Sequence, residues 1–147
     1  MKIAFGNDHA AFEQRAPIME HLEKIGCEVL DCGAPSTDSS DYPDYAQQAC
    51  QAVLDGRCER AVLICGTGIG IGMSANKIKG IRCGVVTDIY GARMSRLHNN
   101  TNAIALRGRY QSLDENLKIL EVWLESEFEG GRHQRRLDKV AKLEENQ

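Results

Sequence analysis

One cysteine stands directly in front of a glycine-rich turn. Residues 64–77 read ICGTGIGIGMSANK, and the glycines that follow Cys65 are Gly66, Gly68, Gly70 and Gly72. Glycines permit a tight turn into a helix, and the amides of that turn then point toward the sulfur. Such amides stabilise anions, which indicates either a thiolate base or an oxyanion that develops on a bound substrate. A buried cysteine before a purely structural glycine loop is the alternative.

The same stretch has a weak match to a nucleotide-binding loop. Residues 70–75 read GIGMSA, which fits G-x-G-x-x-A, and Asp88 follows at about the expected 20 residues. The first of these glycines lies five positions beyond the end of a predicted strand, and too little chain follows for the second half of a dinucleotide fold. A Walker-type phosphate loop is excluded because Lys77 stands between Asn76 and Ile78.

Two further segments carry groups that could handle a sugar. Asp8 and His9 follow the first predicted strand, where the carboxylate either caps the next helix or orients a hydroxyl and the histidine can meet an anion. Residues 96–102, RLHNNTN, place His98 among asparagines before another strand. A histidine in a polar loop is usually only solvated, but an imidazole beside amides that grip hydroxyls is also what acid/base chemistry on a sugar requires.

A glycine pair leads into a basic segment, FEGGRHQRRL at 128–137. Arg132 and Arg136 are i and i+4 on one face of a predicted helix, so both guanidinium groups can close on a phosphate near the helix start. Arg135 faces elsewhere. The alternative is a solvated basic helix.

Composition bounds the class of protein. The 147 residues, with 27% charged residues and a formal net charge of -3, predict a single domain over 1–147 and give no support for nucleic-acid binding. The first apolar run is too short for a signal peptide and no stretch is long enough to span a bilayer, so we expect a cytoplasmic protein with no membrane partner. The cysteines form no C-x-x-C pair, which favours reduced thiols, with all but Cys65 as core residues. His21 and His133 are predicted to lie on helix surfaces.

Short β-branched runs alternate with longer segments of helical period, which is typical of β-α units around a parallel sheet. The predicted strands are 2–6, 27–31, 60–65, 82–87 and 102–106. The predicted helices are 10–25, 43–56, 69–78, 89–97, 112–127 and 133–144. Ligands bind at the carboxyl ends of such strands, which selects the residues after each strand, among them Asp8, Cys65 and Arg109.

Local signals set the expected connections. Gly26, Gly56 and Gly80 stand where helix ends favour a left-handed residue. Pro17 lies inside the first predicted helix, so we expect a kink or a restart there. The turn-forming residues of 32–45 predict the longest loop of the chain, and long loops in compact domains are often functional.

Taken together, the motifs make the chain resemble a known family. They are G-N-D-H-A at 6–10, S-x-D-Y-P-x-Y-A at 39–46, I-C-G-T-G-x-G at 64–70, A-N-K-x-x-G-I-R at 75–82, R-x-H-N-N-x-N at 96–102 and E-G-G-R-H-x-x-R at 129–136. Over nearly its whole length the chain resembles the type B ribose-5-phosphate isomerases, a group that also contains allose-6-phosphate isomerase and the galactose-6-phosphate isomerase subunits.

The resemblance implies a Rossmann-like three-layer α/β/α sandwich with a five-stranded parallel sheet. It implies an aldose-ketose isomerase that needs no metal or other cofactor and acts on a phosphorylated sugar. It also implies a homodimer or homotetramer with active sites at the subunit interface, and the C-terminal helix, about 132–144, is expected to reach a partner subunit.

The resemblance also implies roles for individual residues. Cys65 would move a proton between C1 and C2 while the amides of Gly66, Gly68 and Gly70 hold the enediolate oxygen, and His98 would open the furanose ring. The remaining expected roles are hydroxyl binding by Asp8 and Asn99, assistance by Thr67, contact with the sugar by Tyr42, and phosphate binding by His9, Arg109, Arg132 and Arg136.

A few positions depart from the family pattern. Ala11 stands where a glycine is usual, Pro17 follows shortly after, and Arg107 replaces the glycine of A-L-G-x-R. These changes flank the expected phosphate and sugar pockets and leave the proton-transfer groups intact. The leading hypothesis is interconversion of ribose 5-phosphate and ribulose 5-phosphate. The alternatives are an isomerase of another sugar phosphate, such as an aldohexose 6-phosphate or a tetrulose phosphate, and a non-catalytic module that binds a sugar phosphate or nucleotide.

Overall fold

The computed structural model describes residues 1–146 and has a parallel sheet at its centre. The strands are β1 (Lys2–Asn7), β2 (Glu28–Asp31), β3 (Arg60–Cys65), β4 (Cys83–Val85) and β5 (Ala103–Arg107). They form a five-stranded sheet in the order β2-β1-β3-β5-β4, with every pair parallel. The predicted sheet is confirmed, although β4 is shorter than the predicted strand 82–87.

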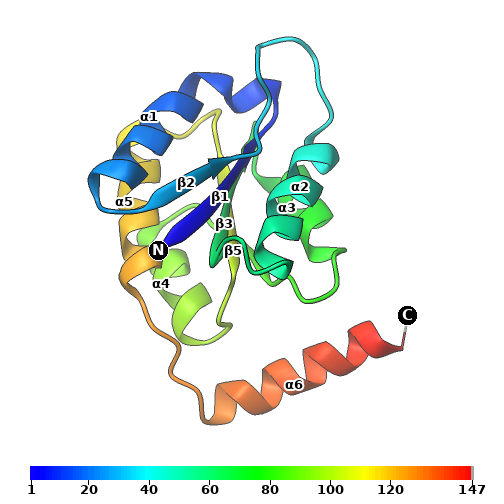
Figure 1. The fold of residues 1–147 in the computed structure, drawn as a ribbon. Helices are drawn as coiled ribbons and strands as arrows, with labels where there is room; N and C mark the ends of the chain where they lie inside the picture. Colours follow the sequence, from blue (N-terminus) through cyan, green and yellow to red (C-terminus); the bar gives the residue numbers. More distant parts are fainter. Residues whose placement is uncertain (147) are drawn as a thin grey trace.

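Helices cover both faces of this sheet (Figure 1). Their bounds are η1 (His9–Ala11), a 3-10 turn, and α1 (Phe12–Lys24), α2 (Tyr42–Leu54), α3 (Ile69–Asn76), α4 (Ile89–Leu97), α5 (Leu113–Glu125) and α6 (Arg132–Glu145). Helices α2 and α3 pack on one face, and α1, α4 and α5 pack on the other. The three-layer α/β/α fold is confirmed.

The two faces of the sheet carry different side chains. Strands β1, β3 and β5 are apolar at nearly every position because a parallel sheet is covered on both sides. The face toward α2 and α3 is built mainly from alanines, including Ala4, Ala61 and Ala105. The opposite face carries larger side chains such as Phe5 and Ile104, which pack with Trp123 of α5. Small side chains under α3 bring this helix, and the turn that precedes it, close to the sheet.

Helix α1 runs unbroken past Pro17. The restart predicted there is therefore wrong, and the irregular turn of this segment is η1, before the helix. Proline removes only the hydrogen bond to the carbonyl four residues earlier, that of Glu13, and Glu13 is exposed so that water can take the bond's place. Gly26, Gly56 and Gly80 adopt φ values of +94°, +74° and +88°, as the helix ends predict.

Helix α6 lies apart from the sandwich (Figure 1). Residues 126–131 form the linker that precedes it. We call the linker and α6 the arm. Hydrogen bonds tie the arm to the body at both ends: Glu129 N–H donates to Leu97 O at 3.0 Å, and Gly80 N–H donates to Glu144 Oε2 at 3.2 Å. Leu137 is buried against the body, whereas Val140 and Leu143 stay exposed.

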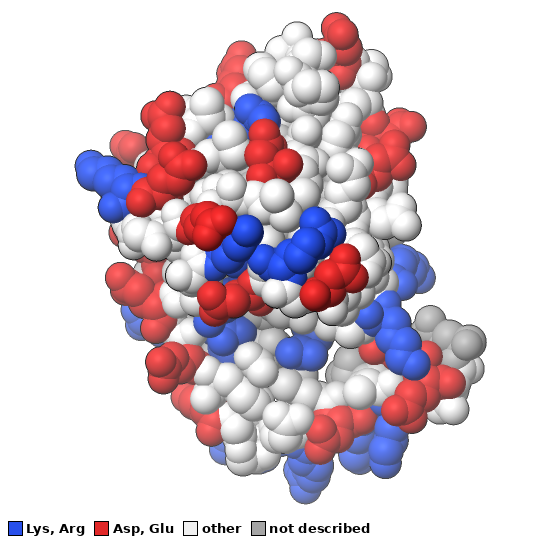
Figure 2. Space-filling view, viewed as in Figure 1, with Lys and Arg blue, Asp and Glu red and all other residues white. Residues whose placement is uncertain are grey.

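Surface properties agree with the composition. Acidic and basic side chains are interspersed over the face drawn in Figure 2. Within residues 1–146, no helix combines the length and apolar character needed to cross a membrane. All of the cysteines lie in this described range and are free thiols, with Cys50, Cys58 and Cys83 buried and Cys27 and Cys32 half-buried.

Candidate active site

A cleft of about 650 Å³ opens at the carboxyl ends of β1 and β3. The predicted site residues that line it are Asp8, His9, Tyr42, Cys65, Gly66, Thr67, Gly70 and Arg109. Residues not singled out from the sequence also line it, namely Ala10, Ser39, Ser40, Asp41, Ile69 and Met73. The cleft gathers four separate segments, each of which follows a strand or leads into a helix, as the rule for parallel sheets predicts.

Cys65 is the last residue of β3 and lines the cleft, although it is only 4% exposed. Its carbonyl accepts the Gly108 N–H at 2.8 Å, which extends the pairing of β3 with β5 past the end of the strand. The backbone is therefore fixed on one side, and the residue borders the cleft while also packing in the core beneath α2 and α3. The alternative of a purely structural cysteine is not favoured by this placement.

The glycine turn leads straight into the N-terminus of α3. Gly68 is the N-cap with φ +75°, and the Ile69 N–H donates to Thr67 Oγ1 at 3.2 Å. The first turn of a helix leaves its amides without intrahelical acceptors, and these amides carry the positive end of the helix dipole. Cys65 and a set of anion-stabilising amides therefore border the same cleft.

Tyr42 packs closely against this turn. A Cβ added at Gly70 would lie 2.5 Å from Tyr42 Cζ and 2.8 Å from Tyr42 Cε1, which is too close for any side chain other than hydrogen. Glycine at this position therefore lets the tyrosine ring lie directly over the start of α3. Tyr42 begins α2, so this contact also joins the two helices that cover one face of the sheet.

Asp8 and His9 occupy the mouth of the cleft. Asp8 Oδ1 accepts the Ala10 N–H at 3.0 Å, so the carboxylate does cap the turn that follows while also lining the cleft. Ser40 holds His9 from the opposite wall: its Oγ accepts the His9 backbone N–H at 3.1 Å, and its N–H donates to His9 Nδ1 at 3.1 Å. His9 Nδ1 also lies 3.2 Å from the Ser40 carbonyl, so the Ser40 backbone can hold either tautomer of the ring.

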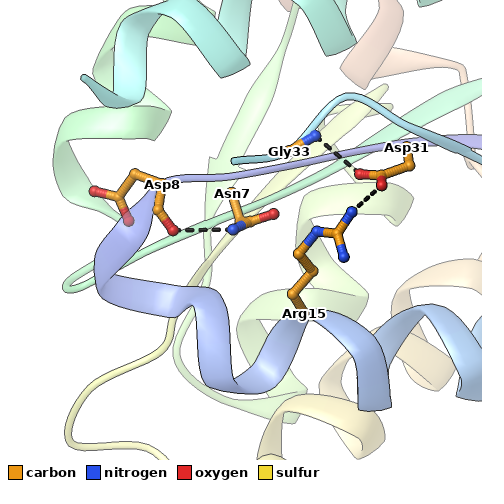
Figure 3. Close-up of polar contacts among 5 residues, drawn as sticks. All are labelled: Asn7, Asp8, Arg15, Asp31 and Gly33. Carbon is orange, nitrogen blue, oxygen red and sulfur yellow. Dashed lines mark hydrogen bonds and ion pairs between the residues drawn. The ribbon is translucent and has the colours of Figure 1, made fainter. Parts of the chain in front are cut away.

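The loop that carries Ser40 is anchored where it leaves β2 (Figure 3). The Asp31 carboxylate pairs with the Arg15 guanidinium and accepts the Gly33 N–H at 3.0 Å. A Cβ at Gly33 would lie 1.9 Å from Asn7 Oδ1, so the loop can pass this buried amide only as glycine. Asn7 Nδ2 in turn donates to the Asp8 carbonyl at 2.9 Å, which links the loop to the residue that lines the cleft.

A network of amide side chains supports the loop that carries Arg109. Asn116, fully buried on α5, donates to Gln14 Oε1 at 2.7 Å and to the Arg107 carbonyl at 2.9 Å. Gln14 Nε2 donates to the carbonyls of Gly108 and Gln111 at 3.2 and 3.0 Å. These contacts fix the chain on both sides of Arg109, whose own N–H donates to the Gly66 carbonyl at 3.0 Å.

The departures from the family pattern lie behind the cleft rather than in it. Arg107 donates from Nε to Gln111 Oε1 at 2.7 Å, and Gln111 donates to the Thr87 carbonyl at 2.9 Å. Ala11 is buried beside Gly108. A Cβ added at Gly108 would lie 2.9 Å from the Cβ of Ala11. Neither Arg107 nor Ala11 is among the residues that line the cleft.

Gly68, the N-cap of α3, is predicted for the site but is not among the lining residues, and four further predicted residues do not line this cleft in the single chain. His98 is the C-cap of α4, Asn99 follows it and is exposed, and Arg132 and Arg136 are exposed on the first turns of α6. We call these four residues the second group. The sequence predicted one site, and the chain presents its parts in two places.

His133 lies against His98 of the second group, and the prediction that it lies on a helix surface is wrong. It is 5% exposed, and its ring stacks on that of His98 with centroids 4.2 Å apart and planes 13° apart. The first turn of α6 packs on the end of α4, which turns this position inward. His21, predicted on a surface too, is half-buried with Nε2 2.9 Å from Glu121 Oε1.

His98, Glu129 and His133 are the cluster within residues 1–146 whose atoms could serve as metal ligands, because these atoms lie within 4.8 Å of one another. A metal ion bound by an imidazole lies in the plane of the ring and about 2.0 to 2.1 Å from the nitrogen. Two nearly parallel rings 4.2 Å apart cannot both place one ion in their planes. The stacked arrangement therefore does not fit a bound metal.

Four of the other cysteines have thiols that resist ionisation. Burial raises the pKa of the Cys50 thiol to about 12, and burial likewise raises the pKa of Cys83, Cys58 and Cys32. None of these four lines the cleft. They stay protonated at neutral pH, and Cys65 is the cysteine that lines the cleft.

Comparison with known proteins decides the family. Residues 3–140 match the model of a family described as Ribose/Galactose Isomerase. The chain belongs to this family. The resemblance seen in the motifs is thereby confirmed.

Individual relatives cover almost the whole chain. It is 44% identical over 144 residues to ribose-5-phosphate isomerase B of Escherichia coli strain K12, covering 98% of this chain and 97% of the relative. It is 37% identical over 145 residues to D-erythrulose-4-phosphate isomerase of Pectobacterium atrosepticum, covering 98% of this chain and 95% of the relative. Among solved structures, ribose-5-phosphate isomerase B of Clostridium thermocellum superposes with a TM-score of 0.98 at 45% identity and covers 99% of both chains.

The comparisons do not favour the nucleotide-binding alternative, and the structure explains why its motif is misleading. Residues 70–75 lie within α3 rather than in the turn that precedes it. Their glycines serve close packing of the helix, which is also the reason for the close contact of Gly70 with Tyr42.

Proposed function

We propose that the protein interconverts ribose 5-phosphate and ribulose 5-phosphate by moving a proton between C1 and C2. Relatives named ribose-5-phosphate isomerase B share 38% and 44% of their residues with this chain, and they support this activity. The observation that carries the proposal is the placement of Cys65 beside the N-terminal amides of α3 at the edge of one cleft.

Chemistry explains why this arrangement suits an isomerase. Removal of the proton at C2 of the open aldose leaves an enediolate, whose oxygen must be stabilised where it forms. The thiolate of Cys65 would take this proton and return it to C1, while amides of Gly66 to Gly70 hold the oxygen. The Thr67 hydroxyl accepts the Ile69 N–H and so keeps its own proton free to donate to the substrate.

The phosphate would lie at the other end of the cleft. A sugar phosphate carries nearly two negative charges and needs several cations or donors. Arg109 and the His9 ring line the cleft and meet part of this need. Asp8 and Tyr42 would contact the sugar between the two ends.

We further propose that a second copy of the chain completes the site. His98, Asn99, Arg132 and Arg136 match family motifs, yet they lie outside the cleft of their own chain, so a partner's cleft is where they would act. Exposed apolar side chains support such an interface: Ile69 and Met73 at the cleft are 56% and 61% exposed, and Val140 and Leu143 project from the arm. The arm would reach the partner in a homodimer or in a homotetramer built from such dimers.

The sugar identity is tested by a panel of phosphosugars. We expect kcat/KM to be highest for ribose 5-phosphate. The relative from Pectobacterium atrosepticum makes a tetrulose phosphate the second candidate. A higher kcat/KM for a tetrulose phosphate or for an aldohexose 6-phosphate would overturn the choice of sugar. Exchange of the C2 proton of the aldose with solvent should accompany turnover, and a protein that only binds phosphosugars would show no exchange.

The proposed setting is the cytoplasm, and the free thiols of the chain support a reducing compartment. We propose that residues 1–147 act as one isomerase domain.

A further inference from the structure

His98, Glu129 and His133 form a compact cluster, which we call the histidine cluster. Glu129 Oε2 lies 3.3 Å from His133 Nε2 and 4.0 Å from His98 Nε2. The carboxylate is therefore set against the same edge of both stacked rings. The backbone holds it there, because the Glu129 N–H donates to the carbonyl of Leu97, the residue before His98.

The two rings differ in what restrains them. The His98 side chain is 38% exposed, whereas that of His133 is 6% exposed. Among residues 1–146, the Glu129 carboxylate is the polar group that faces His133 Nε2, and it does so outside hydrogen-bond geometry. A buried imidazole with so little polar contact costs stability that an apolar side chain would not, so its presence calls for another reason.

We infer that Glu129 and His133 are positioning residues for His98. The buried His133 ring sets the plane of the His98 ring by stacking, and the carboxylate sets which nitrogen faces the arm. With His98 Nε2 turned to Glu129, the Nδ1 atom is left for a substrate in the partner's cleft. This inference rests on the proposed function, in which His98 opens the sugar ring.

Ring opening explains why orientation matters at this residue. Opening ribofuranose breaks the bond from C1 to the ring oxygen O4, moves the proton of the C1 hydroxyl to a base and delivers a proton to O4. The aldehyde at C1 and the hydroxyl at C4 then form with no net gain or loss of protons. A group that performs both transfers must hold one nitrogen near both oxygens, and a carboxylate behind an imidazole fixes the ring and its tautomer in this way.

The chemistry of the two sugars gives a sharp test. Ribose 5-phosphate is mainly cyclic and must open before the C2 proton is accessible. Ribulose 5-phosphate cannot close a five-membered ring, because the oxygen it would need carries the phosphate. Its C1 proton therefore exchanges with solvent through the Cys65 step without any need of His98.

The experiment compares these two reactions in one set of full-length variants. Wild-type protein is assayed for conversion of ribose 5-phosphate and, in D₂O by NMR, for uptake of deuterium at C1 of ribulose 5-phosphate. The variants are Glu129→Gln, Glu129→Ala, His133→Phe and His133→Leu, with His98→Asn as the comparator. Glu127→Gln is the matched control, since it removes the same charge from the same linker at an exposed position.

We expect Glu129→Ala to lower kcat for ribose 5-phosphate about tenfold or more, while deuterium uptake by ribulose 5-phosphate stays within about twofold of wild type. His98→Asn should show the same split to a greater degree. His133→Phe, which keeps a flat ring to stack, should retain more of the ring-opening rate than His133→Leu. Glu127→Gln should leave both reactions unchanged.

Other results would overturn the inference. Equal loss of both reactions in Glu129→Ala would show that the carboxylate supports the fold or phosphate binding instead. Unchanged conversion of ribose 5-phosphate would show that His98 needs no positioning. Failure of the wild-type protein in both assays would contradict the proposed function itself, which keeps the two claims distinguishable.

Discussion

The cleft and the second group differ in how the fold holds them. The cleft is built at the end of the sheet, where Cys65 is fixed by strand pairing and Tyr42 lies against a helix start. The second group stands at the end of α4 and on the arm, where the arginines, Val140 and Leu143 are all exposed. On the function proposed above, the difference teaches that proton transfer would depend on the fold of one chain, whereas ring opening and full phosphate binding would depend on where the arm is placed.

The largest effect on activity is expected in the cleft. Cys65→Ala should lower kcat by about 10²- to 10⁴-fold because it removes the base, with little change in thermal unfolding. Steady-state kinetics with ribose 5-phosphate and a melting curve measure both quantities. Cys32→Ala is the control thiol, which lies outside the cleft and should keep wild-type activity. Retained activity in Cys65→Ala would place the base elsewhere.

The next effect is expected on the arm. Replacing Arg132 and Arg136 together by alanine should raise KM by about tenfold or more for each lost charged hydrogen bond, with a smaller change in kcat. Arg135→Ala, on the same helix but facing elsewhere, should change KM little. An equal rise in KM for Arg135→Ala would indicate a diffuse electrostatic effect rather than a phosphate site.

A smaller effect is expected in the amide network that supports the loop of Arg109. Asn116→Ala leaves the Gln14 amide oxygen and the Arg107 carbonyl without their donor, which should destabilise the fold by about 1–3 kcal/mol. The loop of Arg109 should loosen, so KM should rise more than kcat falls. Urea unfolding and kinetics test this, with the exposed Lys118→Ala on the same helix as control. An unchanged KM would show that the amide network does not hold Arg109 in position to bind the phosphate.

The smallest effect is expected at Ser112, the N-cap of α5, which belongs to neither the cleft nor the second group. The Ser112 N–H and hydroxyl hold the pKa of the Glu115 carboxyl below its ordinary value of 4.5. A depressed pKa in the folded state gives stability that is present above about pH 4.5 and is lost as the pH falls through the lower folded value.

Ser112→Ala should therefore lower the melting temperature at neutral pH, because α5 loses its side-chain cap, and should flatten the loss of stability on acidification. Thermal unfolding between neutral and acidic pH measures this, and kcat/KM should not change. A change in activity would mean that α5 couples to the cleft more tightly than its contacts suggest.

The sequence predicted the parts of the site that follow from strand order and motif spacing. The carboxyl-end rule placed Asp8, Cys65 and Arg109 together because parallel strands end at one edge. Ser40 was missed, since its hold on His9 comes from a loop that only tertiary packing brings across the cleft. The S-x-D-Y-P motif beside it was the available signal.

Burial on the arm was harder to predict. Position 133 reads as a surface position among basic residues, and only the packing of α6 on the end of α4 turns it inward. The unbroken course of α1 past Pro17 has a similar cause, because whether one missing hydrogen bond breaks a helix depends on the solvent around its acceptor.

The central claim is that the cleft of one chain and the second group of another form a single active site. It is tested most directly by mixing Cys65→Ala protein with His98→Asn protein, each inactive on ribose 5-phosphate alone, under conditions that let subunits exchange. Each mixed dimer would then hold one site with both groups intact, and random pairing should restore roughly a quarter of wild-type activity. A mixture that stays as inactive as its components, although mixed dimers form, would contradict the claim.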